Sequence, residues 1–142
     1  MIFSHEIKEG NPSVSILHVG GKVDASNYLE LIEQAKNLIN HKTPQLLINM
    51  EECNFLSSAG LLALLNIALI AHKIDPYDPE EGWSSLRAMA NFDRELKTNF
   101  KLVNVQPNVF RTLDISGLAS KYDIYSNMDD AMAAFKPISG AF

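Results

Sequence analysis

The chain has 142 residues, of which 46% are apolar and 20% are charged, and its formal net charge is −5. This length and composition favour one compact globular domain with a sizeable core and exclude a disordered chain. Direct binding to nucleic acid is not expected of an acidic chain, and a single cysteine, Cys53, excludes an internal disulfide and a zinc site built from cysteine pairs.

The first third of the chain is predicted to form three strands and a helix. Asn11-Pro12-Ser13 is a turn between two strand-forming runs, and Gly20-Gly21 ends the second run. Asn27 and Glu30 have the spacing of a capping box in front of an amphipathic helical pattern. The expected elements are strands at 2–8, 14–19 and 45–50 and a helix at 28–39.

The remainder of the chain is predicted to alternate helices and strands. The helix that begins near Ser58 is apolar nearly all round, so we expect it to be the most buried helix. Asp78 and Pro79 are a start signal for an additional helix, and Ser126 with Asp129 is expected to cap the last one. The expected elements are helices at 58–72, near 79–97, from 107 and after 126, and strands at 100–105 and 121–125.

The order of these elements predicts the fold class. It is β-β-α-β-α, then the additional helix, then β-α-β-α. Alternation of strands and helices implies right-handed crossovers and a largely parallel sheet. We therefore expect an α/β fold with a mixed sheet of about five strands, packed with helices. The chain is expected to be a single domain, residues 1–142, with an insertion at about 73–98.

The segment around Ser57 and Ser58 is the most informative in the chain. Both serines lie where an extended segment turns into the apolar helix, and a helix N-terminus presents unpaired N–H groups and the positive end of the dipole. A serine there can simply cap the helix, or a phosphate on it would meet a ready-made anion site. Gly60 in the first turn costs about 1 kcal/mol relative to alanine, which suggests that something close by needs the space.

Several motifs in the right order give the chain a more specific resemblance. Each is weak alone, but their order and spacing together resemble the STAS domain of bacterial anti-sigma factor antagonists over most of the chain outside residues 73–98. The motifs are Gly20-Gly21-Lys22-Val23-Asp24, the strand 46–50, Phe55-Leu56-Ser57-Ser58-Ala59-Gly60-Leu61, the helix 107–113 with Ser116-Gly117-Leu118, and Asp129-Asp130-Ala131.

The resemblance implies a non-enzymatic switch that regulates transcription. In this family the unphosphorylated domain binds an anti-sigma factor and so frees the sigma factor. A serine-protein kinase, often the same anti-sigma factor, phosphorylates a serine, and a phosphatase reverses the modification. Carried over by motif, the phosphorylated residue is Ser58, with Ser57 as the alternative. The partner-binding residues implied are Asp24, Ser57, Ser58, Ala59, Gly60 and Leu61.

Three features depart from the family pattern. Ser57 stands where many members have aspartate, and Asn49 stands where aspartate is frequent at a strand end. The insertion at 73–98 is the third feature. It carries Trp83, which is either a core anchor or an exposed partner contact. Asp24 itself is either the family's acidic residue near the serine or a turn-forming residue.

Other classes of function fit the sequence less well. A catalytic serine on a nucleophile elbow needs a glycine where Leu56 stands and a later histidine, and the only one after Ser58 is His72 on the same helix. The four histidines lack metal-ligand spacing, and no phosphate loop is present near Gly20-Gly21 for a nucleotide, so no cofactor or metal is expected. The main alternative is a phosphorylation-independent STAS scaffold or a transporter-associated subunit.

The sequence also bears on location. Residues 1–6 lack the basic segment followed by an apolar segment that is typical of a signal peptide. The longest apolar stretch, from Leu61 to Ala71, is interrupted by Asn66 and too short to cross a bilayer. We therefore expect a cytoplasmic protein without membrane insertion. The sequence does not fix the oligomeric state, and a homodimer is one of the options.

Overall fold

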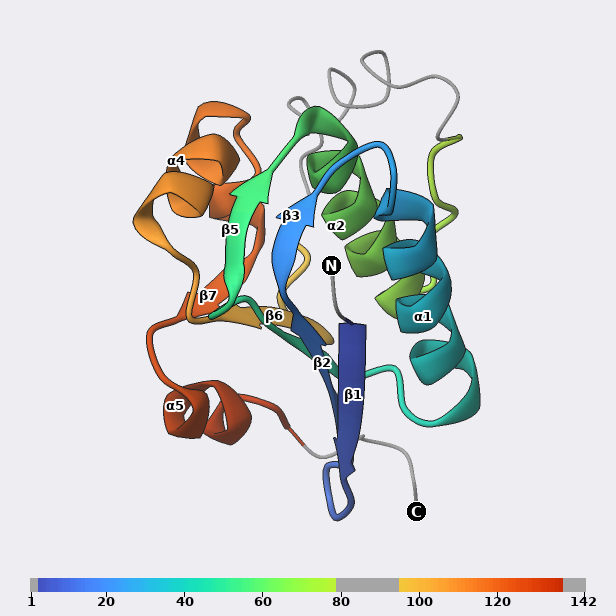
Figure 1. Cartoon of the computed structure of the whole chain (residues 1–142). Helices are drawn as coiled ribbons and strands as arrows, with labels where there is room; N and C mark the ends of the chain where they lie inside the picture. The colour runs from blue at the N-terminus through green and yellow to red at the C-terminus, as the bar shows by residue number, and fades with distance from the viewer. Residues whose placement is uncertain (1–2, 79–94, 137–142) are drawn as a thin grey trace.

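The computed structural model describes residues 3–78 and 95–136 (Figure 1). The helix expected near 79–97, and Trp83 within it, therefore lie outside the described residues, apart from 95–97, which are not helical. Leu96 is buried there, and its N–H donates to the carbonyl of Lys121 at 2.8 Å.

A five-stranded mixed sheet forms the centre of the molecule, as predicted. β1 is an antiparallel edge strand beside β2, and all the other neighbours are parallel, in the order β1-β2-β4-β6-β7. Neighbouring strands are parallel because a helix or another long connection returns the chain to the end of the sheet where the previous strand began. The strands are β1 (Phe3–Lys8), β2 (Val14–Val19), β4 (Leu46–Asn49), β6 (Phe100–Val103) and β7 (Asp123–Tyr125).

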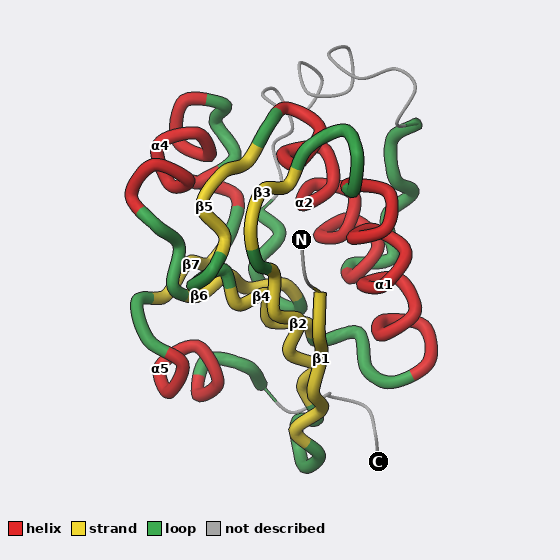
Figure 2. The backbone as a smooth tube through the Cα atoms, viewed as in Figure 1, coloured by secondary structure: helices red, strands yellow, loops and turns green. Residues whose placement is uncertain are grey.

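A second, two-stranded parallel sheet was not anticipated from the sequence. β3 (Gly21–Val23) pairs with β5 (Cys53–Leu56), and Figure 2 shows this pair rising from the end of the main sheet where β2 and β4 finish. Gly21 has a φ of 77°, which a residue with a side chain rarely adopts, so this glycine allows the chain to turn from β2 into β3. The N–H of Gly21 donates to the carbonyl of Glu52 at 2.9 Å.

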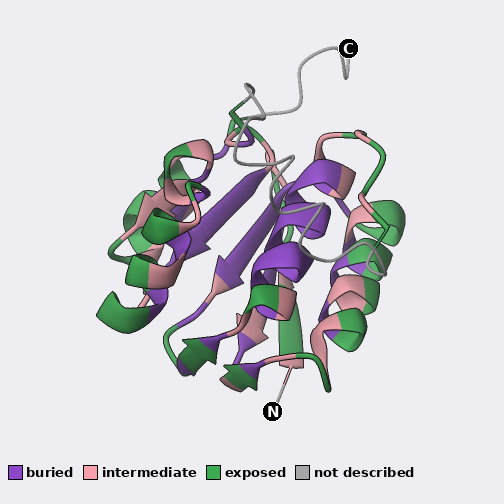
Figure 3. Ribbon diagram, turned by 90° about the horizontal axis from the view of Figure 1, so that it is seen from above, coloured by how far each residue is buried: buried purple, intermediate pink, exposed green. Residues whose placement is uncertain are grey.

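Two long helices cover one face of the main sheet. α1 (Tyr28–His41) packs against α2 (Ser58–Ala71), and the large apolar cluster lies between these helices and the sheet. α2 is buried on nearly every side, as predicted, and Figure 3 shows it in the colour of buried residues along most of its length. α5 (Met128–Ala133) packs on β6 and β7 over a smaller cluster on the other face.

The chain between β6 and β7 forms α4 (Pro107–Ile115) and a single 3-10 turn, η2 (Ala119–Lys121). α4 begins at Pro107, as predicted, because a proline at the first helical position loses no helical hydrogen bond. It packs against β5, and the side chains of Gln106 and Asn108 donate to the carbonyls of Glu51 and Asn54, each at 2.7 Å. α4 thereby fixes the strand that leads into α2.

One predicted helix cap is right only in its position, and another is wrong. Asn27 occupies the N-cap position of α1, but its side chain accepts from the N–H of Asp24 at 3.0 Å and gives no cap hydrogen bond. The cap of α5 is Asn127, not Ser126, and it accepts from the N–H of Asp130 at 2.9 Å. In both places several backbone N–H groups lie within reach of the polar side chain. Residue spacing alone does not determine which of them donates to it.

Candidate functional site

The site is built around the first turn of α2. Ser57 is the N-cap residue in an extended conformation, and its Oγ accepts from the N–H of Gly60 at 3.3 Å. The N–H of Ser57 donates to the carbonyl of Val23 at 2.9 Å, so β3 holds the cap in place. Of the two interpretations of this segment, the simple helix cap therefore applies to Ser57.

Ser58 has different surroundings from its neighbour. It is the first residue of α2 and is exposed to solvent, whereas Ser57 is half-buried. Within the described part of the chain, no hydrogen bond involves the Ser58 hydroxyl, which leaves it accessible. Its position at the positive end of the helix dipole favours a negative charge placed on it.

Gly60 is required by packing. A Cβ at this position would lie 2.5 Å from Cδ1 of Leu56 and 3.0 Å from the carbonyl oxygen of Val23. Both neighbours belong to the β3–β5 pair, so the glycine allows the first turn of α2 to approach that pair closely. The expectation that something near Gly60 needs the space is confirmed.

Asp24 lies directly beside this turn. Val23 and Leu56 are partners in the parallel register of β3 and β5, so Asp24 and Ser57 are the next residues on two neighbouring strands. Asp24 Oδ1 accepts from the Ser26 hydroxyl at 2.6 Å and from the Ser26 N–H at 2.9 Å. These hydrogen bonds, the hydroxyl one first, lower the pKa of the Asp24 carboxyl, which is therefore ionised at neutral pH.

The predicted site residues differ in exposure. Ser58 is exposed and Asp24, Ser57 and Ala59 are half-buried, while Gly60 and Leu61 are turned into the core. Leu61 is only 6% exposed, so it can support the site from beneath but offers little surface to a partner.

Sequence reasoning missed two exposed apolar side chains, one on the strand that leads into α2 and one on the helix that packs against it. Phe55 on β5 is 46% exposed and Leu29 in the first turn of α1 is 55% exposed. No sequence signal identified Phe55, because strict alternation along β5 would place it on the same face as the buried Cys53; the register of β5 with β3 is irregular here, and two consecutive residues of β5 are exposed.

Asn49, one of the departures from the family pattern, belongs to a polar network at the ends of the strands. Its Oδ1 accepts from Asn104 Nδ2 and from the Glu51 N–H, each at 3.2 Å, and its Nδ2 lies 3.0 Å from His18 Nδ1. Asparagine supplies both a donor and an acceptor here, whereas an ionised aspartate would supply acceptors only.

The described residues were also compared with the requirements of a metal site and of a membrane-spanning helix, and they meet neither. No group of three metal-ligating side chains occurs within residues 3–78 and 95–136. None of the helices in that part of the chain is long and apolar enough to cross a bilayer.

Comparison with known proteins agrees with the resemblance. Residues 7–74 match the family model of the STAS domain. The matched segment, which runs from β1 to just after α2, is similar to the STAS domain. No curated protein sequence is detectably similar to it.

Solved structures show where this fold occurs. The chain is 22% identical to an anti-sigma factor antagonist from Mycobacterium paratuberculosis, with 94% of this chain and 93% of that chain covered and a TM-score of 0.63. For the anti-sigma factor antagonist SpoIIAA in its unphosphorylated form the identity is 14%, the coverage 91% and 93%, and the TM-score 0.61. For the phosphorylated form of the Bacillus cell fate determinant SpoIIAA the values are 13%, 92% and 97%, and 0.56. The chain therefore has the STAS fold of anti-sigma factor antagonists.

Proposed function

We propose that this protein is an anti-sigma factor antagonist that binds an anti-sigma factor through the surface around Ser58 and is switched off by phosphorylation of that serine. The observation that carries the proposal is the contrast between the two serines. Ser57 caps α2, while the Ser58 hydroxyl is exposed and has no hydrogen bond among the described residues. A kinase can therefore reach Ser58 without breaking the cap.

The proposed switch is electrostatic. A phosphate on Ser58 adds roughly two negative charges at neutral pH. It would sit one residue beyond Ser57, which the register of β3 and β5 places beside the ionised Asp24, and three residues beyond the apolar Phe55, which is 46% exposed. A partner that has buried this surface would then have to desolvate a doubly charged group, and any acidic group on it would be repelled. Binding of the anti-sigma factor is lost, and the sigma factor is sequestered again.

Several features of the proposal follow from this role. The partner is an anti-sigma factor or serine-protein kinase, and a phosphatase restores the binding form. The activity is protein binding in the cytoplasm, without enzymatic chemistry, membrane insertion or direct contact with nucleic acid. Residues 1–142 act as one STAS domain with an insertion at about 73–98, and a homodimer is compatible with this role.

A second candidate is a STAS scaffold or transporter-associated subunit that binds without phosphorylation. The exposed Phe55 and Leu29 favour a binding surface under either candidate. The two candidate functions differ in whether a negative charge on Ser58 changes the affinity for the partner protein.

Mass spectrometry of the protein from its native cells, under stress and in rich growth, tests the switch. We expect a phosphate on Ser58 whose occupancy changes with condition. Ser58→Ala should retain the co-purifying anti-sigma factor and Ser58→Asp should release it. Ser57→Asp is a control for charge on the adjacent residue, provided that it remains folded. If both serines stay unmodified in every condition, or if Ser58→Asp binds like the wild type, the switch is wrong and the scaffold is favoured.

A further inference from the structure

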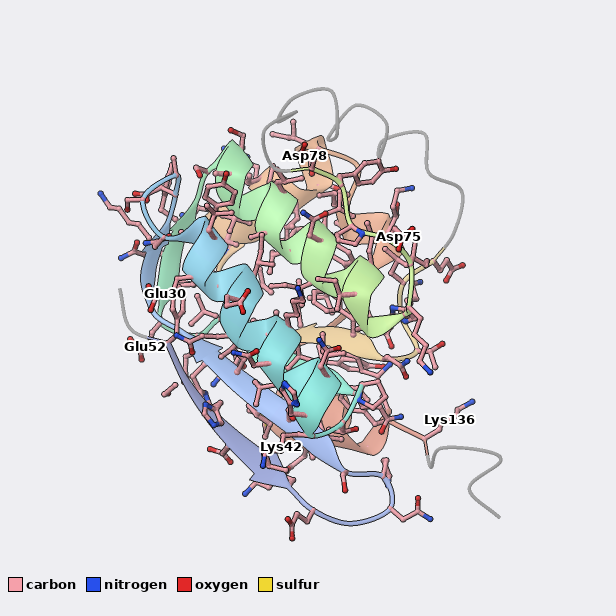
Figure 4. All side chains as sticks on the ribbon, turned by 90° about the vertical axis from the view of Figure 1, so that its right-hand side faces the viewer. Glu30, Lys42, Glu52, Asp75, Asp78 and Lys136 are labelled. Atoms are coloured by element: carbon pink, nitrogen blue, oxygen red, sulfur yellow. The ribbon has the colours of Figure 1, made fainter. Side chains whose placement is uncertain are left out.

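The two edges of the main sheet differ in how well they are protected against pairing with another chain. β7 has only three residues, whereas β1 has six, all in continuous antiparallel register with β2 and without a proline or a register shift. Among the described residues β1 pairs only with β2, and Figure 4 shows it at one margin of the molecule. A long, regular edge strand presents a row of unpaired N–H and C=O groups to which another strand can bind.

An apolar side chain in this edge strand has no place in the core. Ile7 is half-buried but belongs to neither of the two apolar clusters of the described residues, whereas Phe3 on the same face of β1 packs against the larger one. The residues around Ile7 are polar, since Glu6, Lys8 and Glu9 are all exposed. Burial of Ile7 against an apolar side chain of a second strand would stabilise the pairing of the two strands.

The charges on β1 are complementary to those of a second copy of the same strand. A twofold axis perpendicular to the sheet would place two copies of β1 side by side and antiparallel, with directly opposite residues on the same face. With Ile7 on the axis, Ile7 lies opposite Ile7 of the second copy and Glu6 lies opposite Lys8. His5 then lies opposite Glu9, the residue that follows β1. The segment from His5 to Glu9 is therefore complementary to itself.

The other registers lack this complementarity. Because directly opposite residues share a face, the axis must pass through a residue and not between two. An axis at Glu6 places two carboxylates opposite each other, and an axis at Lys8 does the same for two ammonium groups. Like charges directly opposite each other destabilise a sheet. An axis at His5 places Glu6 opposite Ser4, so the second copy supplies no opposite charge to Glu6.

We infer that the protein pairs with a second copy of itself through β1, with Ile7 on the twofold axis, so that the two main sheets join into one. Within one copy Glu6 lies 3.3 Å from Lys8 and 3.2 Å from His18. The Lys8 and Glu6 side chains are nevertheless 59% and 47% exposed, so both can also contact the second copy. The paired segments are short, so the dimer is expected to be weak. The interface does not include Ser58, and the inference goes beyond the proposed function.

Sedimentation velocity of the full chain, at roughly 10 µM to 1 mM protein, tests the inference. We expect a reversible monomer–dimer equilibrium that weakens as salt is raised. Lys8→Glu should weaken the dimer at least about tenfold, because it brings like charges opposite each other on both sides of the axis. The double variant Glu6→Lys/Lys8→Glu exchanges the two charges and keeps the pairing, so it should restore the dimer to within about threefold.

A control and a cross-linking experiment complete the test. Arg111→Glu also reverses one exposed charge, but on α4, far from β1 in Figure 1, and should leave the dimer unchanged. Under mild oxidation, Ile7→Cys should give a disulfide-linked dimer and His5→Cys should not. The native Cys53 is buried and should not react.

Three results would overturn the inference. The first is a chain that stays monomeric at the highest concentration. The second is a charge exchange that fails to restore the dimer weakened by Lys8→Glu, or an equal loss in Arg111→Glu. The third is cross-linking through His5→Cys in place of Ile7→Cys, which would put the axis at another residue. None of these measurements involves an anti-sigma factor or a phosphate, so their failure leaves the proposed function untouched.

Discussion

Ser57 and Ser58 are adjacent residues with different structural roles, and stability measurements can separate them. Ser57→Ala removes the acceptor for the Gly60 N–H and should lower the free energy of unfolding by about 1 kcal/mol. Ser58→Ala removes no hydrogen bond seen in the described residues and should change it by less than about 0.5 kcal/mol. Urea denaturation monitored by circular dichroism measures both. If Ser58→Ala were the more destabilising change, the assignment of the cap to Ser57 would be wrong.

Gly60 offers a second test at the scale of one residue. Helix propensity alone predicts that Gly60→Ala stabilises the protein by about 1 kcal/mol. The new Cβ, however, would lie 2.5 Å from Cδ1 of the buried Leu56, and overpacking of a core costs about 1–3 kcal/mol. We therefore expect net destabilisation of about 1 kcal/mol in urea denaturation.

A double-mutant cycle identifies the cause of that destabilisation. Leu56→Ala removes the atoms that the new Cβ would meet first, so Gly60→Ala should cost less in the Leu56→Ala background than in the wild type. Equal costs in both backgrounds would mean that the Val23 carbonyl, 3.0 Å from the same Cβ, sets the penalty instead.

At the scale of elements, β6 and β7 are joined by a partly buried ion pair. Lys101 Nζ lies 2.8 Å from Asp123 Oδ2, and the Lys101 side chain is only 5% exposed. The Lys101 ammonium also donates to the carbonyl of Lys97 at 2.7 Å and lies 5.0 Å from the ring centre of Phe135 on the α5 side. Removal of one partner would leave the other charge buried and unpaired, which is costly.

The pH dependence of stability reports on this pair. Burial acts to raise the pKa of Asp123, but hydrogen bonds from Lys101 and Tyr125 outweigh it and hold the pKa below the ordinary value of 3.8. An acid with a lowered pKa stabilises the fold above its unfolded-state pKa, and this contribution is lost as pH falls through the folded-state value. Asp123→Asn should therefore cost about 2 kcal/mol at neutral pH, and the difference from wild type should shrink below about pH 4.

Urea denaturation over a pH series measures this difference. The exposed pair Glu95–Lys97, at 3.0 Å, supplies the control, because Glu95→Gln should change stability by less than about 1 kcal/mol at any pH in the series. A cost of Asp123→Asn that stayed constant down to strongly acidic pH would show that the changed hydrogen bonding to Lys101 and Tyr125 matters and the charge does not.

At the scale of the whole molecule, much of the fold could be predicted from the sequence. The five strands of the main sheet and the helices α1, α2, α4 and α5 follow from apolar periodicity and turn residues, which are local signals. The β3–β5 pair could not be predicted in this way. Its strands have three and four residues and are separated by the whole of α1 and β4, so their pairing depends on the tertiary structure.

The same limit applies to polar residues whose partners are distant in sequence. Asn66 interrupts an apolar helix, and only the structure shows why: its side chain donates to the Tyr77 carbonyl and accepts from the Tyr77 N–H, each at 2.9 Å. At the candidate site, motif resemblance predicted Ser58 and Asp24, and the register of β3 with β5 places Asp24 beside Ser57. The exposure of Phe55 could not be predicted, because β5 does not alternate strictly between buried and exposed residues and its register with β3 is irregular.

Phe55 gives a last prediction, which joins the fold to the proposed partner surface. An exposed aromatic side chain next to the first turn of α2 can anchor a partner. Phe55→Ser should weaken binding of the anti-sigma factor at least about tenfold. Its effect on the free energy of unfolding should be below about 1 kcal/mol, because the side chain is 46% exposed. Calorimetric titration with the anti-sigma factor that co-purifies from native cells measures the first effect, and urea denaturation measures the second.

Phe110→Ser is the matched control for this variant. Phe110 is 43% exposed, close to the value for Phe55, but it lines a separate cavity between α4 and the end of β7, with Ile124 and Tyr125. The two variants therefore remove the same chemical group from two different surfaces. Loss of binding in Phe55→Ser alone would locate the partner on the surface that carries Ser58 and Asp24. Equal loss in both variants would point to a general effect of surface aromatic residues, and loss in Phe110→Ser alone would move the partner to α4.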